Sequence, residues 1–174
     1  MKRIANICRE NLAKLKVGQQ LLISGKIYTA RDQAHKRLSQ AILYGGKLPL
    51  DLKDKIIYYC GPTRTPAGKS IGSCGPTTSS RMDEFTPVLL NHGVLALIGK
   101  GNRSEAVVEA IKKYKAVYFL TFAGCGALLT KYVKKMKPIA YKNLGPEKIC
   151  ELEVEDFPVI VAIDSKGRNI YGKS

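Results

Sequence analysis

Strand-like and helix-like hydrophobic patterns alternate along the middle of this chain. Apolar runs of strand length occupy residues 94–98 and 116–121, and segments with a helical spacing of apolar residues follow them at 102–113 and 124–134. Strands that alternate with helices favour a parallel sheet, because a parallel connection needs a crossover segment. The pattern therefore predicts an α/β domain with a parallel central sheet.

The two ends of the chain add further predicted elements to this centre. The N-terminal half predicts, in order, a lead-in segment at 1–18, a strand at 19–29, a helix at 29–44, strands at 55–60 and 71–74, and a helical segment at 80–91. The C-terminal end predicts strands at 138–141, 150–154, 159–164 and 169–171, with a turn at 164–167. No repeat or long linker divides the sequence, so we expect a single domain over 1–174 with a mixed or second, smaller sheet.

Composition excludes several classes of protein. With 45% hydrophobic and 25% charged residues, the 174-residue chain has ordinary globular usage, unlike a disordered or fibrous protein. No apolar run approaches the roughly 18 residues that a membrane helix needs. Residues 1–6 are partly basic but lack the continuous apolar segment of a secretory signal. We therefore expect a soluble, cytoplasmic protein that does not insert into a membrane.

Net positive charge is the first indication of a partner. The 29 Lys and Arg residues outnumber the 14 Asp and Glu residues, which gives a net charge of +15 at pH 7. Such an excess favours an anionic partner, whether nucleic acid, an acidic subunit or a small dianion. The basic residues are scattered, aromatic residues make up only 7% of the chain, and no aromatic RNA-binding motif occurs. Nucleic acid is therefore not the partner that we expect.

The cysteines do not form a recognisable metal or disulfide pattern. There are five, at positions 8, 60, 74, 125 and 150, and the only histidines are His35 and His92. An odd count argues against a disulfide framework, and without a Cys-x-x-Cys motif no zinc or iron–sulfur site can be assigned from local spacing. We expect these cysteines to be small buried hydrophobic residues, and we expect no metal ligands in this chain.

Candidate ligand-binding residues lie in the turns after predicted strands, where α/β sheets bind their ligands. In the first turn, Arg31 lies within about 40° of His35 on the apolar face of its helix, at about 100° per residue. A guanidinium removed from water needs an anion, and the free N–H groups of a helix start add to that attraction. The alternative is an internal ion pair with Asp or Glu, or a side chain that extends back to solvent.

The second and third turns carry two more cations. Arg81 follows four hydroxyl residues, 77–80, and Lys100 lies between two glycines. One hydroxyl is enough to cap a helix, so the surplus favours an oxyanion ligand with Arg81 as a bidentate clamp. Glycines beside Lys100 let a ligand approach the backbone closely. Three pairs have the spacing of helix N-terminal caps, namely Thr29 with Asp32, Ser80 with Asp83, and Asn102 with Glu105.

Together these turns predict a receptor for a small polycarboxylate. They do not make a complete catalyst, since no Ser/His/Asp arrangement is evident. A fourth turn, 123–127, is rich in glycine, but Leu129 stands where a dinucleotide fingerprint has its third glycine. The chain therefore carries one half of a catalytic site at most.

These same turns resemble the β subunit of class I fumarate hydratases and, in a sister enzyme, the β subunit of L(+)-tartrate dehydratase. The resemblance rests on the motifs SGKIYTARD (24–32) with AHKR (34–37), GPTTSSRMD (75–83), IGKG (98–101) and LEVEDFP (152–158). It extends from about residue 12 to the end of the sequence. It implies a swivelling β/β/α three-layer domain.

The resemblance also implies roles for particular residues. Arg31, Arg81 and Lys100 would bind the carboxylates of fumarate or malate, with Thr78 beside them. Thr77 would face the reacting carbon, and the family proposes this threonine as the base that takes the C3 proton. His35 would orient Arg31 or relay a proton.

A separate α subunit would hold a four-iron, four-sulfur cluster on three cysteines, and this chain would bind no cluster alone. The expected reaction is reversible hydration of fumarate to (S)-malate, with L(+)-tartrate dehydration as the alternative. A homodimer of the chain or of the αβ unit would be compatible with both. The alternative from another class is a basic module that binds nucleic acid or an acidic protein.

Overall fold

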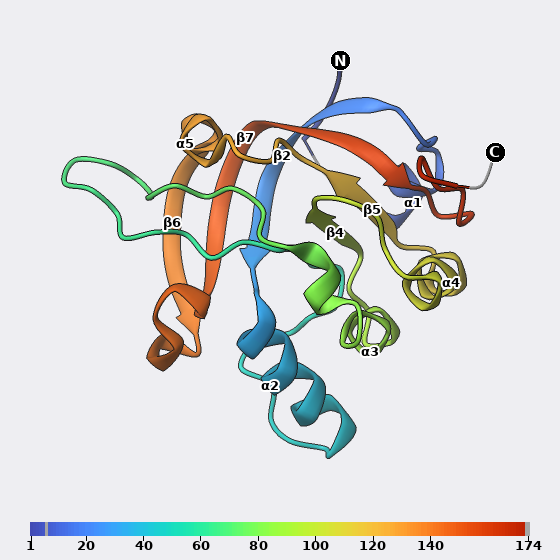
Figure 1. Ribbon diagram of the computed structural model, residues 1–174, viewed down its shortest axis with the longest axis horizontal. Coiled ribbons are helices and arrows are strands. Elements are labelled where there is room, and N and C mark those ends of the chain that lie inside the picture. The colour runs from blue at the N-terminus through green and yellow to red at the C-terminus, as the bar shows by residue number, and fades with distance from the viewer. Residues whose placement is uncertain (6, 173–174) are drawn as a thin grey trace.

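The computed structural model describes residues 1–5 and 7–172 (Figure 1). Its strands are β1 (Lys2–Ile4), β2 (Gln20–Thr29), β3 (Ile56–Tyr58), β4 (Ala96–Gly99), β5 (Val117–Leu120), β6 (Val133–Ala140) and β7 (Ile149–Ile163). Its α-helices are α1 (Arg9–Ala13), α2 (Asp32–Leu43), α3 (Thr86–Asn91), α4 (Glu105–Tyr114) and α5 (Gly126–Leu129). Shorter 3₁₀ turns are η1 (Ser79–Met82), η2 (Thr130–Tyr132) and η3 (Lys142–Glu147).

The strands join into one mixed sheet, which confirms a mixed α/β architecture. Strands β2, β3, β4 and β5 pair in parallel, as the alternating pattern predicts, and β1 extends this order beside β2. The long strand β7 then pairs antiparallel with β5, with β6 and also with β2. The antiparallel strands are thus hydrogen-bonded to the parallel ones, and the expected second sheet is not separate.

Side chains on the two faces of the parallel strands belong to two apolar clusters. In β4, Ala96 and Ile98 pack with residues of β2 and β7, whereas Leu97 packs with residues of α2, α3 and α4. This alternation follows from the two-residue period of a strand. All four residues of β4 are buried, which explains the continuous apolar run that the sequence shows. Figure 1 shows α2, α3 and α4 together along one side of these strands.

Strand β7 corrects the prediction of two short strands at 150–154 and 159–164. The strand runs without interruption through residues 155–158, which the prediction leaves outside both short strands. Its irregular point is Asp156, which has a positive φ of 52° and whose N–H donates to Ser24 Oγ at 3.0 Å. A side chain of β2 therefore satisfies the backbone group that the interrupted ladder leaves free.

Other predicted elements are shorter than expected or absent. Residues 71–74 are not a strand, and 169–171 make only an isolated bridge from Asn169 to Ile163. The predicted helix 124–134 ends early, because β6 already begins at Val133. The lead-in contains β1 and α1, and the helical segment 80–91 is divided between η1 and α3.

None of the three expected cap pairs caps a helix. Thr29 ends β2, and its hydroxyl accepts a hydrogen bond from the N–H of Cys150 at 3.0 Å. Arg31 and Ser104 occupy the N-cap positions of α2 and α4 without a side-chain cap bond. Asp83 instead accepts hydrogen bonds from the turn after β4. Spacing alone could not show these distant partners.

No helix in the described part of the chain is long and apolar enough to cross a membrane.

His35 is fully buried on α2. Its Nδ1 lies 2.9 Å from the carbonyl oxygen of Arg31, and its ring contacts the edge of Tyr59 with 5.2 Å between ring centres. Nε2 is buried with no hydrogen-bond partner among the described residues. Burial lowers the pKa of His35 from 6.5 to about 4, so the imidazole is neutral at pH 7.

We expect His35 to make the folded chain less stable as the pH falls from 6.5 towards 4. In that window the unfolded chain binds a proton at His35 that the folded chain excludes. The free energy of unfolding therefore falls by up to about 1.4 kcal/mol per pH unit from this residue alone. Urea unfolding at pH 7.5 and pH 5 should show a smaller pH dependence in His35→Gln than in the wild type.

The same substitution at His92, which is exposed, provides the control, because His35 is then still present. Equal pH dependence in His35→Gln and in the wild type would contradict a buried neutral imidazole.

Candidate functional site

The turns that carry the predicted site residues meet at one edge of the sheet. Arg31 follows β2, and Lys100 follows β4. Thr77 is far along the chain from β3 but is hydrogen-bonded to its end, since its N–H donates to the carbonyl oxygen of Tyr59 at 2.8 Å. These are the carboxyl ends of parallel strands, as the sequence analysis expects for a ligand site.

Arg31 lies between two carboxylates. Its Nε is 3.5 Å from Asp32 Oδ2, and its Nη2 is 3.5 Å from Glu147 Oε1. The internal ion pairs that the sequence left open as an alternative are therefore present. Neither Arg31 Nε nor Asp32 Oδ2 has a hydrogen-bond partner among the described residues, although both atoms are buried. The guanidinium thus keeps unused hydrogen-bonding capacity at the strand end.

The close packing around Arg31 requires a glycine at position 61. A Cβ built on Gly61 would lie 2.5 Å from Arg31 Cδ and 2.9 Å from the carbonyl oxygen of Pro146. Any side chain there would displace the arginine or the turn before β7. Gly61, which follows β3 by three residues, therefore leaves the space in which Arg31 extends across the strand ends.

Arg81 connects the first two turns. Its Nε is 3.0 Å from Asp32 Oδ1, and its Nη2 donates to Thr77 Oγ1 at 2.8 Å. Asp32 thus bridges Arg31 and Arg81, which would otherwise repel one another. With 47% of its side chain exposed, Arg81 is accessible to a ligand while its guanidinium is oriented.

Lys100 is held beside the same segment by its main chain. Its N–H donates to Ser79 Oγ at 2.9 Å, and that hydroxyl donates to the carbonyl oxygen of Thr77 at 3.0 Å. In the described ranges no carboxylate lies within ion-pair distance of Lys100 Nζ. A depression of about 480 Å³ adjoins it, lined by Thr78, Ser79, Ser80, Lys100, Gly101, Asn102, Arg103 and Ala123.

Charge at the site is nearly compensated within the chain. Arg31 and Arg81 pair with the two carboxylates of Asp32 and Glu147, and Lys100 adds a third positive charge to this edge of the sheet. One positive charge is left over, that of Lys100, which has no acidic partner among the described residues. Cations held this close by fixed carboxylates are ordered before a ligand arrives, so less free energy is spent on arranging them when it binds.

The two remaining predicted residues lie at the margins of this cluster. Thr78 is exposed, precedes η1 and lines the depression beside Lys100. His35 lies on the core side of Arg31 and contacts its carbonyl oxygen, so its effect on the guanidinium passes through the main chain. The structure therefore brings Arg31, Thr77 and Arg81 into one contact network.

Sequence reasoning missed the acidic members of this network. Glu147 is 114 residues from Gln33, whose N–H donates to Glu147 Oε2 at 2.9 Å, and no local pattern links the two positions. Asp32 and Asp83 were identified only as cap partners. Their spacing from Arg31 and Arg81 was visible, but their true role as acceptors for arginine side chains depends on the folded turns.

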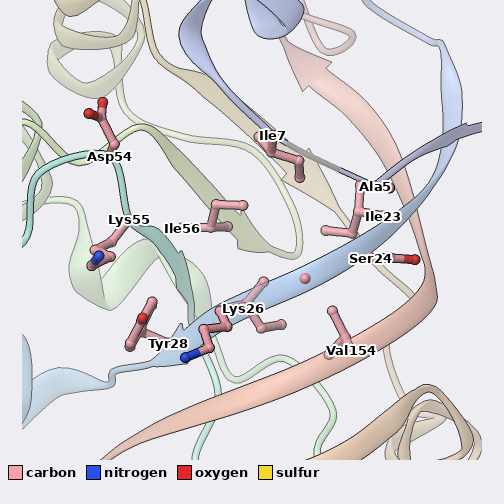
Figure 2. Close-up of a pocket in the computed structure, with 12 residues that line it drawn as sticks. Ala5, Ile7, Ile23, Ser24, Lys26, Tyr28, Asp54, Lys55, Ile56 and Val154 are labelled. Carbon is pink, nitrogen blue, oxygen red and sulfur yellow. The ribbon is translucent and has the colours of Figure 1, made fainter.

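A separate pocket lies against the middle of β2 and the start of β3. Figure 2 shows its aliphatic residues, among them Ile23, Ile56 and Val154, with Lys26 and Lys55 near Tyr28. Lys55 Nζ is 5.6 Å from the centre of the Tyr28 ring. At about 180 Å³ this pocket is small, and it contains none of the predicted site residues.

Cys60, Cys74 and Cys150 are buried, as the sequence predicts, whereas Cys8 is partly exposed and Cys125 is exposed, which the prediction did not give. Iron–sulfur cluster ligands are thiolates, yet burial raises the pKa of the Cys74 thiol to about 12 and also raises the pKa values of the Cys60 and Cys150 thiols. Over residues 1–5 and 7–172, no three His, Cys, Asp or Glu side chains gather where they could hold a metal ion.

Comparison with known proteins gives the same two enzymes that the motifs suggest. The chain is 40% identical over 162 residues to "Fumarate hydratase class I, anaerobic" of Escherichia coli K12, and 37% identical over 176 residues to "Fumarate hydratase 2" of Leishmania major. It covers 30% and 31% of those proteins, while they match 92% and 100% of this chain. The chain thus spans about a third of their length.

A second kind of relative is matched over nearly its whole length. The chain is 33% identical over 181 residues to "L(+)-tartrate dehydratase subunit beta" of E. coli K12. The matched region covers 100% of this chain and 89% of that subunit. The sequence profile described as "Fumarase C-terminus" matches residues 1–174. The chain therefore belongs to the fumarase C-terminus family.

Proposed function

We propose that this chain is the β subunit of a two-subunit hydro-lyase that acts on a four-carbon dicarboxylate. The observation that carries the proposal is the contact network of Arg31, Asp32, Arg81 and Thr77 at the strand ends, with Lys100 beside it. Near-complete coverage of a β subunit supports the two-subunit organisation. The proposed reaction is reversible hydration of fumarate to (S)-malate, and L(+)-tartrate dehydration is the alternative that the same relatives support.

In this proposal the cations bind the substrate and fix its orientation. A dicarboxylate has two charged ends, and Arg31 and Lys100 lie in different turns that could each take one end. Arg81 supplies the planar donor groups suited to a carboxylate, and its hydrogen bond orients the Thr77 hydroxyl.

We assign the transfer of the C3 proton to the hydroxyl oxygen of Thr77. Hydration adds the hydroxyl group of water to C2 and a proton to C3, and dehydration removes both. A threonine hydroxyl is a weak base, but the adjacent guanidinium favours its deprotonated form and lowers the free energy of proton removal. Among the described residues, Arg81 is the titratable side chain that is hydrogen-bonded to the Thr77 hydroxyl.

The other half of the site belongs to a partner in this proposal. We assign the four-iron, four-sulfur cluster to an α subunit, as the resemblance implies, and burial of Cys60, Cys74 and Cys150 disfavours their thiolate forms in this chain. The β/β/α swivelling arrangement implied by the resemblance would let the strand-end turns close over that partner. A homodimer of the αβ unit is compatible with these roles.

The first experiment is anaerobic activity of this chain co-expressed with its candidate cluster-bearing partner. Fumarate hydration and L(+)-tartrate dehydration are followed side by side, with each protein alone as a control. We expect turnover only when both proteins are present, and the substrate that is converted faster identifies the enzyme. Failure of the proteins to associate, together with salt-sensitive binding of nucleic acid by this chain, would instead support a basic binding module.

Substitution of Arg81 tests the assigned cation. Arg81→Ala in the assembled enzyme should lower kcat/KM, and the loss should correspond to about 2–4 kcal/mol of transition-state stabilisation. The reason is that a substrate carboxylate and the Thr77 hydroxyl each lose a hydrogen-bond donor. Arg3→Ala is the matched control, since Arg3 is exposed and pairs with Asp156 at 3.0 Å away from the site. Turnover of Arg81→Ala close to that of the control would remove Arg81 from the site.

Substitution of Glu147 tests whether a substrate carboxylate competes with it for Arg31. Glu147→Gln can still accept the Gln33 N–H but carries no charge, so KM for the dicarboxylate should fall about two- to fivefold. The control is Glu151→Gln, which removes a carboxylate paired with Lys26 at 3.0 Å. A rise in KM for Glu147→Gln would show that Glu147 positions Arg31 for substrate instead of competing with it.

A further inference from the structure

Arg103 and Asp83 form a buried ion pair behind the strand-end turns. The Arg103 side chain is 1% exposed, its Nη1 is 2.5 Å from Asp83 Oδ1, and its guanidinium carbon lies 5.1 Å from the centre of the Tyr118 ring. A buried pair of this kind adds little stability over apolar residues of similar volume. What the pair contributes must therefore be sought in its contacts with the turn after β4 and with the segment that contains Arg81.

The pair connects the turn after β4 with the segment of the Thr77–Arg81 motif. Arg103 Nη2 donates to the carbonyl oxygen of Lys100 at 3.3 Å. On the other side, Asp83 Oδ2 accepts the N–H of Ser104 at 2.7 Å. Asp83 follows η1, which contains Arg81, so these bonds fix one turn against the other.

A second contact holds Lys100 from the opposite direction. Its N–H donates to Ser79 Oγ of the neighbouring segment, and its carbonyl oxygen accepts from Arg103 of its own turn, so side chains bind both main-chain polar groups of Lys100. The fit is close, because a Cβ at Gly99 would lie 2.5 Å from Ser79 Oγ. Lys100 is thus the one assigned cation that is placed through its backbone, with its ammonium group unpaired in the described residues.

We propose that the Asp83–Arg103 pair is a positioning device that fixes Lys100 relative to Thr77 and Arg81. The pair thereby sets the distance between the cations that receive the two carboxylates. Arg103 does not touch substrate itself, because its side chain is buried. The proposal rests on the assignment of Lys100 to substrate binding in the proposed function.

The test is Arg103→Lys in the assembled αβ enzyme. A lysine keeps the charge that Asp83 needs, but a single ammonium group cannot reproduce the planar pair of donors that reaches both Asp83 and the Lys100 carbonyl. KM for the dicarboxylate should rise about tenfold while kcat stays within about twofold. In a Lys100→Ala background, Arg103→Lys should raise KM no further, since its effect passes through Lys100.

Two more variants separate positioning from general stability. Ser79→Ala removes the other bond to Lys100 and should raise KM in the same direction. Arg168→Lys is the matched control, because Arg168 pairs with the buried Asp164 at 2.7 Å in the turn after β7, and it should leave KM unchanged. A comparable rise in KM with and without Lys100, or with Arg168→Lys, would overturn the proposal.

Hydrogen exchange of the complex gives a readout that does not depend on the substrate. The amides of residues 99–104 should exchange faster in Arg103→Lys and Ser79→Ala than in Arg168→Lys. Unchanged exchange there would refute the positioning role. Faster exchange in an αβ complex that turns over neither fumarate nor tartrate would uphold the positioning of Lys100 and reject the proposed function.

Discussion

The pairing of β7 with both β2 and β5 determines how the strand-end turns are arranged. Tyr28, near the end of β2, pairs with Glu151, near the start of β7, although 123 residues separate them. This pairing brings the turn before β7 to the end of β2, where Glu147 reaches Arg31. The same strand also pairs with β5, so β7 joins the parallel strands to the turn that carries Glu147.

Fixed carboxylates then order the cations at this edge. Asp32 lies between Arg31 and Arg81, so two positive groups remain close together without a ligand. Lys100 is placed differently, through its main chain. The two guanidinium groups are thus oriented in advance, which lowers the free-energy cost of binding an anion.

How much of the fold and of the candidate site can be predicted from the sequence depends on how far apart along the chain the interacting residues are. The apolar runs at 94–98 and 116–121 are buried on both faces and form parallel strands as predicted, and Arg31 and Lys100 follow strands as predicted. Arg81 lies in η1, which does not follow the predicted strand at 71–74. The contacts of Glu147 with Arg31 and of Arg103 with Asp83 were not predicted, because these residues meet only after distant turns converge. The strand predicted at 71–74 is wrong, because a buried segment without strand pairing has the same apolar pattern.

The long reach of β7 also orders events during synthesis. Gln20 pairs with Ile160, so β2 is synthesised long before β7, the strand that covers its backbone groups and apolar side chains. Contacts between such distant residues carry a large loop-closure entropy, and folds that depend on them form slowly. The growing chain must therefore leave one edge of β2 unpaired until residues 149–163 emerge, and an unpaired strand edge of this kind is prone to aggregation.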